Sequence, residues 1–138
     1  MSSYSAVYQV PEIEDLETDT HSEVLFADTR LDQSRVRAAV DAVFEAHPEL
    51  GTVFEPFFDS WTSRPGGGWT WAVEPRGVTV AEVFARQCSF FDKRIGRLFA
   101  VSLLPGSPDR LLLTASRLCL DSPSWETVVD ELLAEYHS

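Results

Sequence analysis

The stretch Leu111–Trp125 has the sequence LLLTASRLCLDSPSW and contains the pattern that decides the fold. Its opening leucines are typical of a strand that is buried on both faces. Asp121 or Ser122 can then cap a helix, because Pro123 suits the first helical turn. The apolar stripe of that helix consists of Trp125, Val128, Val129, Leu132, Leu133 and Tyr136. A buried strand that leads directly into an amphipathic helix predicts a layered α/β domain.

Similar patterns upstream predict the rest of the domain. Asp32 can cap a helix that Pro48 ends, and Pro56 restricts its segment to an edge strand or to a strand that ends there. The glycines in Arg64–Gly68 indicate a flexible, hairpin-type connection. The predicted elements are strands over 22–28, 51–58 and 69–73, helices over 33–47 and 79–88, and an antiparallel strand pair over 98–104 and 110–116. Together they predict one α/β domain over 1–138, a mixed sheet with helices packed on it.

Charge and composition exclude several classes of partner. The chain has 22 acidic and 11 basic residues, a net charge of −11, and no large basic cluster. Nucleic acids and anionic membranes are bound through concentrated positive charge, so we expect neither. No secretory leader or bilayer-spanning run is recognisable, which favours a cytoplasmic protein with reduced Cys88 and Cys119. The sequence has no metal-ligand spacing or dinucleotide fingerprint, so we expect no metal or cofactor.

Three segments occur in an order that points to a known family. The first includes Leu31-Asp32 and His47-Pro48-x-Leu50-Gly51-Thr52-x-Phe54, the second is Phe91-Asp92-x-x-x-Gly96-x-Leu98-Phe99-Ala100, and the third is Leu111–Tyr136. Together they resemble the N-terminal lobe of nonribosomal peptide synthetase condensation domains, members of the chloramphenicol-acetyltransferase-like superfamily. The resemblance covers about residues 22–137 and implies half of that fold. Residues 1–20 are atypical, because the short opening helix of the family is not recognisable there.

The third segment departs from the family at its catalytic motif, His-His-x-x-x-Asp-Gly. Ser116 stands at the first histidine position and Arg117 at the second, while Asp121 is kept and Ser122 replaces the glycine. In the resembled enzymes the second histidine positions or deprotonates the acceptor amine. A guanidinium has no lone pair to accept a proton and stays charged at neutral pH. We therefore expect no catalytic residue in this degenerate motif, and Arg117 could instead pair with Asp121.

The other histidines offer little replacement chemistry. His47 falls at a helix C-terminus, where a positive imidazole has a structural role. His21 and His137 lie near the ends of the chain, so we do not expect either in the site. The family's active site also lies between two lobes, of which this chain supplies one.

A lobe without its counterpart would expose an apolar face, and such faces usually bind a partner. The candidate aromatic residues are Phe57, Phe58, Trp61, Trp69, Trp71, Tyr4 and Tyr8, although any one of them could instead fill the core.

The function implied by the resemblance is a non-catalytic interaction module in nonribosomal peptide biosynthesis. It would dock to an adenylation domain, a carrier protein or a tailoring enzyme. One alternative is half of a split acyltransferase, completed by another chain or by self-association as a homo-oligomer. A third possibility is a remnant that only aids the folding or solubility of an adjacent synthetase module.

Overall fold

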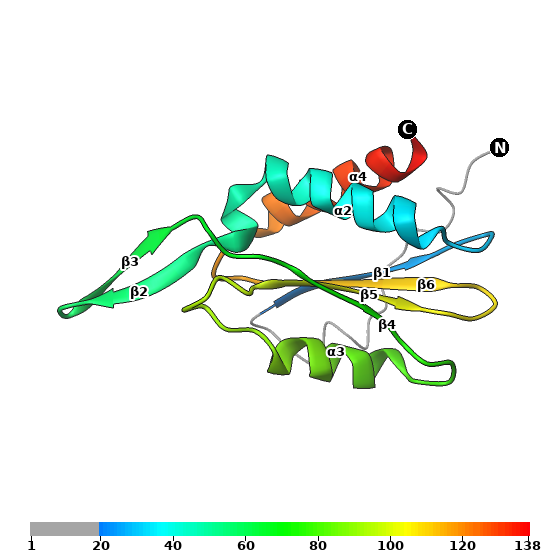
Figure 1. Ribbon diagram of the computed structural model, residues 1–138, viewed down its shortest axis with the longest axis horizontal. Coiled ribbons are helices and arrows are strands. Elements are labelled where there is room, and N and C mark those ends of the chain that lie inside the picture. The colour runs from blue at the N-terminus through cyan, green and yellow to red at the C-terminus, as the bar shows by residue number, and fades with distance from the viewer. Residues whose placement is uncertain (1–19) are drawn as a thin grey trace.

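The computed structural model describes residues 20–138, so the candidate residues Tyr4 and Tyr8 lie outside the described part. A four-stranded mixed sheet lies between two helical layers, with α2 and α4 on one face and α3 on the other (Figure 1). The strands are β1 (Thr20–Phe26), β4 (Thr70–Val73), β5 (Phe99–Leu104) and β6 (Arg110–Ser116). Their order across the sheet is β1-β6-β5-β4, with β4 parallel to β5 and the other pairs antiparallel. The predicted fold class is confirmed.

Local capping explains where the three α-helices within residues 20–138 begin. The Asp32 side chain accepts a hydrogen bond from the Arg35 amide at 3.2 Å, and Thr79 forms a capping box with Glu82. Asp121 caps the last helix, accepting from the Ser124 amide at 2.9 Å. Each cap satisfies amide groups that have no partner within the helix. The helices are α2 (Gln33–Ala46), α3 (Val80–Ser89) and α4 (Ser122–His137).

The two faces of the sheet carry separate cores. Phe99 and Leu113 point toward α2 and α4, where Trp125 packs edge-on against Phe99 at 6.4 Å between ring centroids. Leu112 lies on the opposite face, in a smaller cluster with Val83 of α3. Because each fully buried side chain of this size contributes about 1.5–3 kcal/mol, these cores hold the three layers together.

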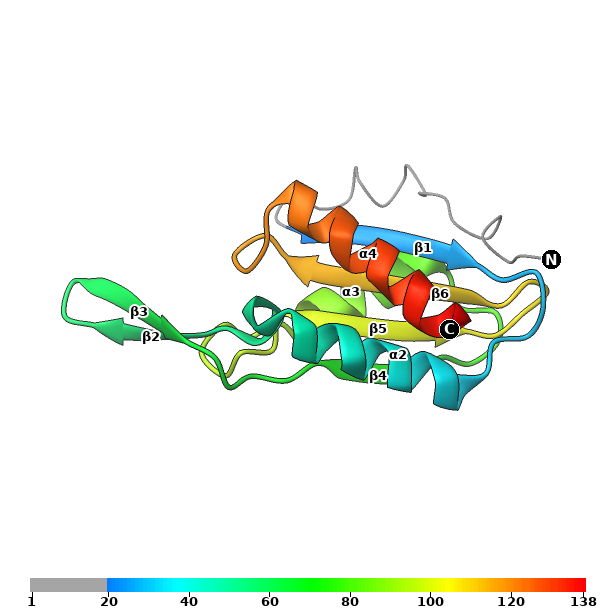
Figure 2. The same cartoon turned by 90° about the horizontal axis from the view of Figure 1, so that it is seen from above.

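The structure corrects the sequence prediction at residues 58–68. A hairpin of β2 (Val53–Phe57) and β3 (Ser60–Arg64) projects from one end of the sheet (Figures 1 and 2). Its turn lies at Phe58 and Asp59, whereas the sequence suggested a hairpin turn over 64–68. Those residues instead connect β3 to β4, which pairs with β5. The strand β3 was missed because all of its residues are exposed and so lack apolar alternation.

The middle residue of the triple glycine packs closely against another part of the backbone. The Gly67 amide donates to the Gly51 carbonyl at 2.7 Å. A Cβ atom at Gly67 would lie 2.2 Å from the Gly96 carbonyl oxygen, and Gly96 itself has a φ of +72°. Only glycine allows backbones to approach so closely, so the connection that the sequence suggested as a flexible loop contains one tightly packed position. This contact fastens the base of the hairpin to the loop before β5.

Candidate functional site

The degenerate motif lies where β6 ends and α4 begins. The β2–β3 hairpin and the loop 90–98 lie at the same end of the sheet, and we call these three segments the hairpin end (Figure 1). Two backbone hydrogen bonds connect them: Ser116 donates to Leu98 at 2.9 Å, and Phe54 donates to Lys93 at 2.8 Å. Segments far apart in the sequence therefore form one continuous surface.

Ser116, which the sequence resemblance assigns to the first histidine position, is buried at 7% exposure. Its hydroxyl accepts a hydrogen bond from the Leu118 amide at 3.1 Å. Its carbonyl accepts from the thiol of Cys119, and burial raises the pKa of that thiol to about 12. These contacts make Ser116 part of the tight turn that follows β6.

Arg117, at the second histidine position, is exposed, and its guanidinium donates to the Ser122 hydroxyl at 3.4 Å. The suggested pair with Asp121 does not form. The Asp121 carboxylate instead caps α4, and hydrogen bonds from Ser124 hold its pKa below the usual range. The cap replaces the expected ion pair with Arg117 because the Asp121 carboxylate satisfies a main-chain amide in the first turn of α4.

His21, although near the start of the chain, is held in the sheet. This residue lies in β1 opposite Ala115 and is only 4% exposed. Its Nε2 lies 3.0 Å from the Leu120 carbonyl, and its ring stacks on Trp125. Burial lowers its pKa, although the Leu120 carbonyl and Asp121 act in the opposite direction. A neutral imidazole thus supports the motif turn from behind, and its Nε2 carries the hydrogen that Leu120 accepts.

The sequence contains only a weak signal for the buried position of His21. Period-two alternation in β1 puts His21 on the same face as Leu25, which indicates an inward position. It does not indicate which residues His21 meets, because that depends on pairing with β6, more than 90 residues away. His47 agrees with its expected structural role: it caps α2 and contacts Glu131 at 2.7 Å.

Three of the candidate aromatic residues come together on the hairpin. Phe58 is 91% exposed at the turn with a φ of 56°, and Phe57 packs edge-on against it at 4.6 Å between centroids. Trp61 is also exposed, and the Lys93 ammonium lies 4.2 Å from its ring centroid. Arg94 lies 5.6 Å from the same centroid. The hairpin end therefore presents aromatic rings and cations together.

Trp69 and Trp71 lie elsewhere, against the α2 side of the core. The Trp69 indole donates to Asp41 at 2.8 Å, and Arg37 lies over the ring of Trp71. Both side chains are partly buried against core residues. The structure therefore separates these two tryptophans from the hairpin aromatics.

Further exposed apolar side chains, not foreseen from the sequence, lie at the hairpin end. Among the described residues, six of the seven large exposed hydrophobic side chains are found there: Phe57, Phe58, Trp61, Phe90, Ile95 and Leu118. Val73 is the exception. A pocket of about 370 Å³ opens beside Lys93, Arg94, Ser116 and Leu118. Isolated apolar residues in loops carry no periodic signal, which is why the sequence did not indicate them.

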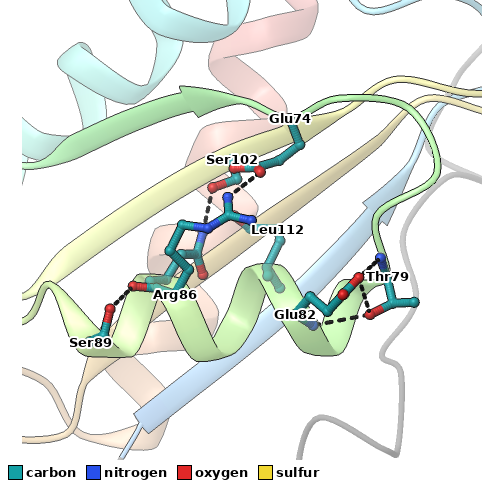
Figure 3. Close-up of polar contacts among 8 residues, drawn as sticks. Glu74, Thr79, Glu82, Arg86, Ser89, Ser102 and Leu112 are labelled. Carbon is teal, nitrogen blue, oxygen red and sulfur yellow. Dashed lines mark hydrogen bonds and ion pairs between the residues drawn. The ribbon is translucent and has the colours of Figure 1, made fainter.

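A cluster of polar side chains connects α3 to the sheet by hydrogen bonds and an ion pair (Figure 3). The buried Glu74 carboxylate pairs with Arg86. The Gln87 amide donates to Ser102 at 2.9 Å and to the Leu112 carbonyl at 3.2 Å, and accepts from Thr114 at 2.6 Å. Because these buried groups satisfy one another, the cluster has a structural role.

No family model and no curated protein matches this sequence. Solved structures do match it. The epimerization domain from the third module of tyrocidine synthetase B has a TM-score of 0.71 at 20% identity, covering 86% of this chain and 30% of that one. The condensation domain from the monacolin K polyketide synthase MokA has a TM-score of 0.70 at 16% identity, covering 87% and 29%. The complex of the X-domain and OxyB from teicoplanin biosynthesis gives 0.64 at 21% identity, covering 86% and 27%.

These comparisons establish the fold. The chain has a partial chloramphenicol-acetyltransferase-like fold, consistent with the N-terminal lobe of condensation domains. It spans about 30% of the length of the tyrocidine synthetase chain. Within residues 20–138, no helix is long and apolar enough to cross a bilayer.

Proposed function

We propose that this chain is a non-catalytic, condensation-like interaction module in nonribosomal peptide biosynthesis. Its partner is an adenylation domain, a carrier protein or a tailoring enzyme. The observation that carries the proposal is the gathering of exposed apolar side chains at the hairpin end, beside the degenerate motif. A solved neighbour is a complex of an X-domain with OxyB, which supports a docking role for this kind of fold.

The chemistry at the motif supports the same proposal. Arg117 is solvent-exposed and bonded to Ser122, and a guanidinium cannot accept a proton. His21 is close in space, but it is buried between β6 and α4, and its Nε2 is bonded to a main-chain carbonyl. Neither side chain offers an accessible base to an incoming amine.

Phe58 is the centre of the proposed docking surface. An aromatic residue that is 91% exposed, in a backbone conformation that favours glycine, is costly for an isolated protein. Burial of such a side chain against a partner returns hydrophobic free energy, and aromatic residues dominate many interfaces. Phe57 and Trp61 enlarge the surface on either side of the turn.

The test is direct binding. The 138-residue chain is immobilised, and the purified synthetase domains, carrier proteins and tailoring enzymes encoded beside it are passed over by biolayer interferometry. We expect one of them to bind and F58S to weaken that binding about tenfold or more. V73T is the matched control, because Val73 is exposed away from the hairpin end. The proposal fails if none of these proteins binds, or if the unmodified chain alone condenses a carrier-bound donor with an acceptor.

The alternative is half of an acyltransferase that another chain or a second copy completes. The pocket beside Ser116 favours it, since a second chain closing over this pocket would produce an enclosed site. This alternative predicts amide or ester formation when the partner is added, and a changed rate with R117H. Under the leading proposal, no amide or ester forms when the partner is mixed with the unmodified chain or with R117H.

A further inference from the structure

The hairpin end differs in charge from the rest of the molecule. Its three segments, residues 53–64, 90–98 and 117–121, contain five of the 11 basic residues and four of the 22 acidic ones. Their net charge is +1, whereas the remainder of the chain carries −12. The basic residues are Arg64, Lys93, Arg94, Arg97 and Arg117.

Several carboxylates at this end are already engaged within the chain. Glu55 pairs with Arg64 at 3.0 Å, Asp92 accepts from the Arg94 amide at 3.0 Å, and Asp121 caps α4. By contrast, within residues 20–138, neither the Lys93 ammonium nor the Arg94 guanidinium forms a salt bridge; both lie over the ring of Trp61. These two cations are thus held at the surface with their charge available.

We infer that the partner docks an acidic protein surface on Lys93 and Arg94 around Trp61, while its apolar residues cover Phe57 and Phe58. This inference rests on the proposed docking function and adds the chemistry of the partner. A cation stacked on an exposed indole gains only about 0.5–1 kcal/mol from the ring, so it can still bind a carboxylate. The aromatic ring and the cation would then be buried together, as is common for the dominant residues of protein interfaces.

Charge distribution also argues against other classes of partner. A basic protein would be attracted to the remainder of the surface, which carries −12, rather than to this end. Nucleic acid would be repelled by that same charge, and the basic residues of the hairpin end are too few to follow a phosphate backbone. An acidic protein can approach favourably at the hairpin end, and its orientation on the surface is set by the same charges.

Lys93 is the only lysine in the chain, which makes the test specific. A water-soluble carbodiimide joins an amine directly to a carboxylate that contacts it. The complex of the 138-residue chain with the co-encoded protein that binds is treated with this reagent, and linked peptides are identified by mass spectrometry. We expect a link between Lys93 and an aspartate or glutamate of the partner.

Three variants separate the possible outcomes. K93R keeps the charge but removes the amine, so binding should persist while the link disappears. The double variant K93E/R94E should weaken binding about tenfold or more, whereas R76E, an exposed arginine outside the hairpin end, should not change it. Thermal unfolding of each variant checks that the fold is retained.

The inference is overturned if the partner binds K93E/R94E as well as the unmodified chain. It is also overturned if Lys93 links only to carboxylates of its own chain, such as those of residues 12–19. In either case partner binding itself would remain, and the proposed function would stand. If no co-encoded protein binds at all, both the proposed function and this inference fail.

Discussion

The imidazole of His21 and the indole of Trp125 stack with ring centroids 5.6 Å apart and planes inclined by 13°. The pair joins β1 to α4. The hydrogen bond between His21 and the Leu120 carbonyl connects β1 to the turn that contains Arg117. Three segments that are distant in the sequence thus meet behind the degenerate motif. The arrangement keeps the motif turn ordered without exposing an imidazole to solvent.

Burial of His21 should make the protein less stable in weak acid. Its pKa is lowered in the folded state, so the unfolded chain binds a proton more readily. The His21 contribution to stability is therefore complete above the unfolded pKa of about 6.5 and decreases as pH falls toward the folded value. We expect urea midpoints to fall between pH 6.5 and 5.0, and to fall less in H21F.

H21F keeps an aromatic ring beside Trp125 but loses the hydrogen bond to Leu120, which costs about 1 kcal/mol at pH 7.5. If H21F and the unmodified protein lost stability in parallel below pH 6.5, His21 would not be the group responsible.

His47 should act in the opposite direction. Burial disfavours its protonation, but the hydrogen bonds and charges of Glu131 and Glu49 outweigh that effect and raise its pKa. Its contribution to stability is present below about pH 6.5 and is lost as pH rises through the folded pKa. The effect is small, about 0.3–1 kcal/mol, because both glutamate side chains are more than 40% exposed to solvent, at 42% and 46%.

H47Q should therefore flatten the loss of stability between pH 6.5 and 8, measured by urea denaturation. A slope that persists in H47Q would assign the effect to another group.

Gly67 should be intolerant of a side chain, unlike its neighbour. In G67A the new methyl group would collide with the Gly96 carbonyl, and the backbone would have to move. We expect a loss of about 2–4 kcal/mol, comparable to other severe packing defects. A Cβ at Gly68 meets nothing within 4 Å, so G68A should change stability by less than about 1 kcal/mol. Equal unfolding temperatures for the two variants would contradict the close contact.

The stability of the protein should depend on the ion pair between buried Glu74 and Arg86. R86M would leave a carboxylate without its cation beneath the sheet, at a cost of about 2–3 kcal/mol because Arg86 itself is partly exposed. Replacement of both residues, as in E74L/R86M, should recover most of that loss. R76M removes an exposed arginine of the same region and should cost less than about 0.5 kcal/mol. Additive losses in the double-mutant cycle would show that the pair is not coupled.

Much of the fold could be predicted because its determinants are local. Asp32, Thr79 and Asp121 satisfy amides within three residues of themselves, so each helix start is encoded next to the residue that caps it. The leucine run of β6 is recognisable for a similar reason, since burial on both faces requires apolar residues at consecutive positions. The resemblance that assigns Ser116 and Arg117 to the two histidine positions also rests on the sequence alone.

Tertiary structure alone decided which distant segments meet. The position of His21 depends on the antiparallel register of β1 and β6, and the contact between Gly67 and Gly96 depends on how the hairpin meets the loop before β5. Lys93 and Trp61 are 32 residues apart in sequence, and no periodic pattern relates them. Capping and periodicity act over a few residues, so the sequence by itself indicated most of the helices and strands. Strand register and close backbone contacts arise from the packing of distant segments. Only the tertiary structure therefore decided which side chains form the surface at the hairpin end.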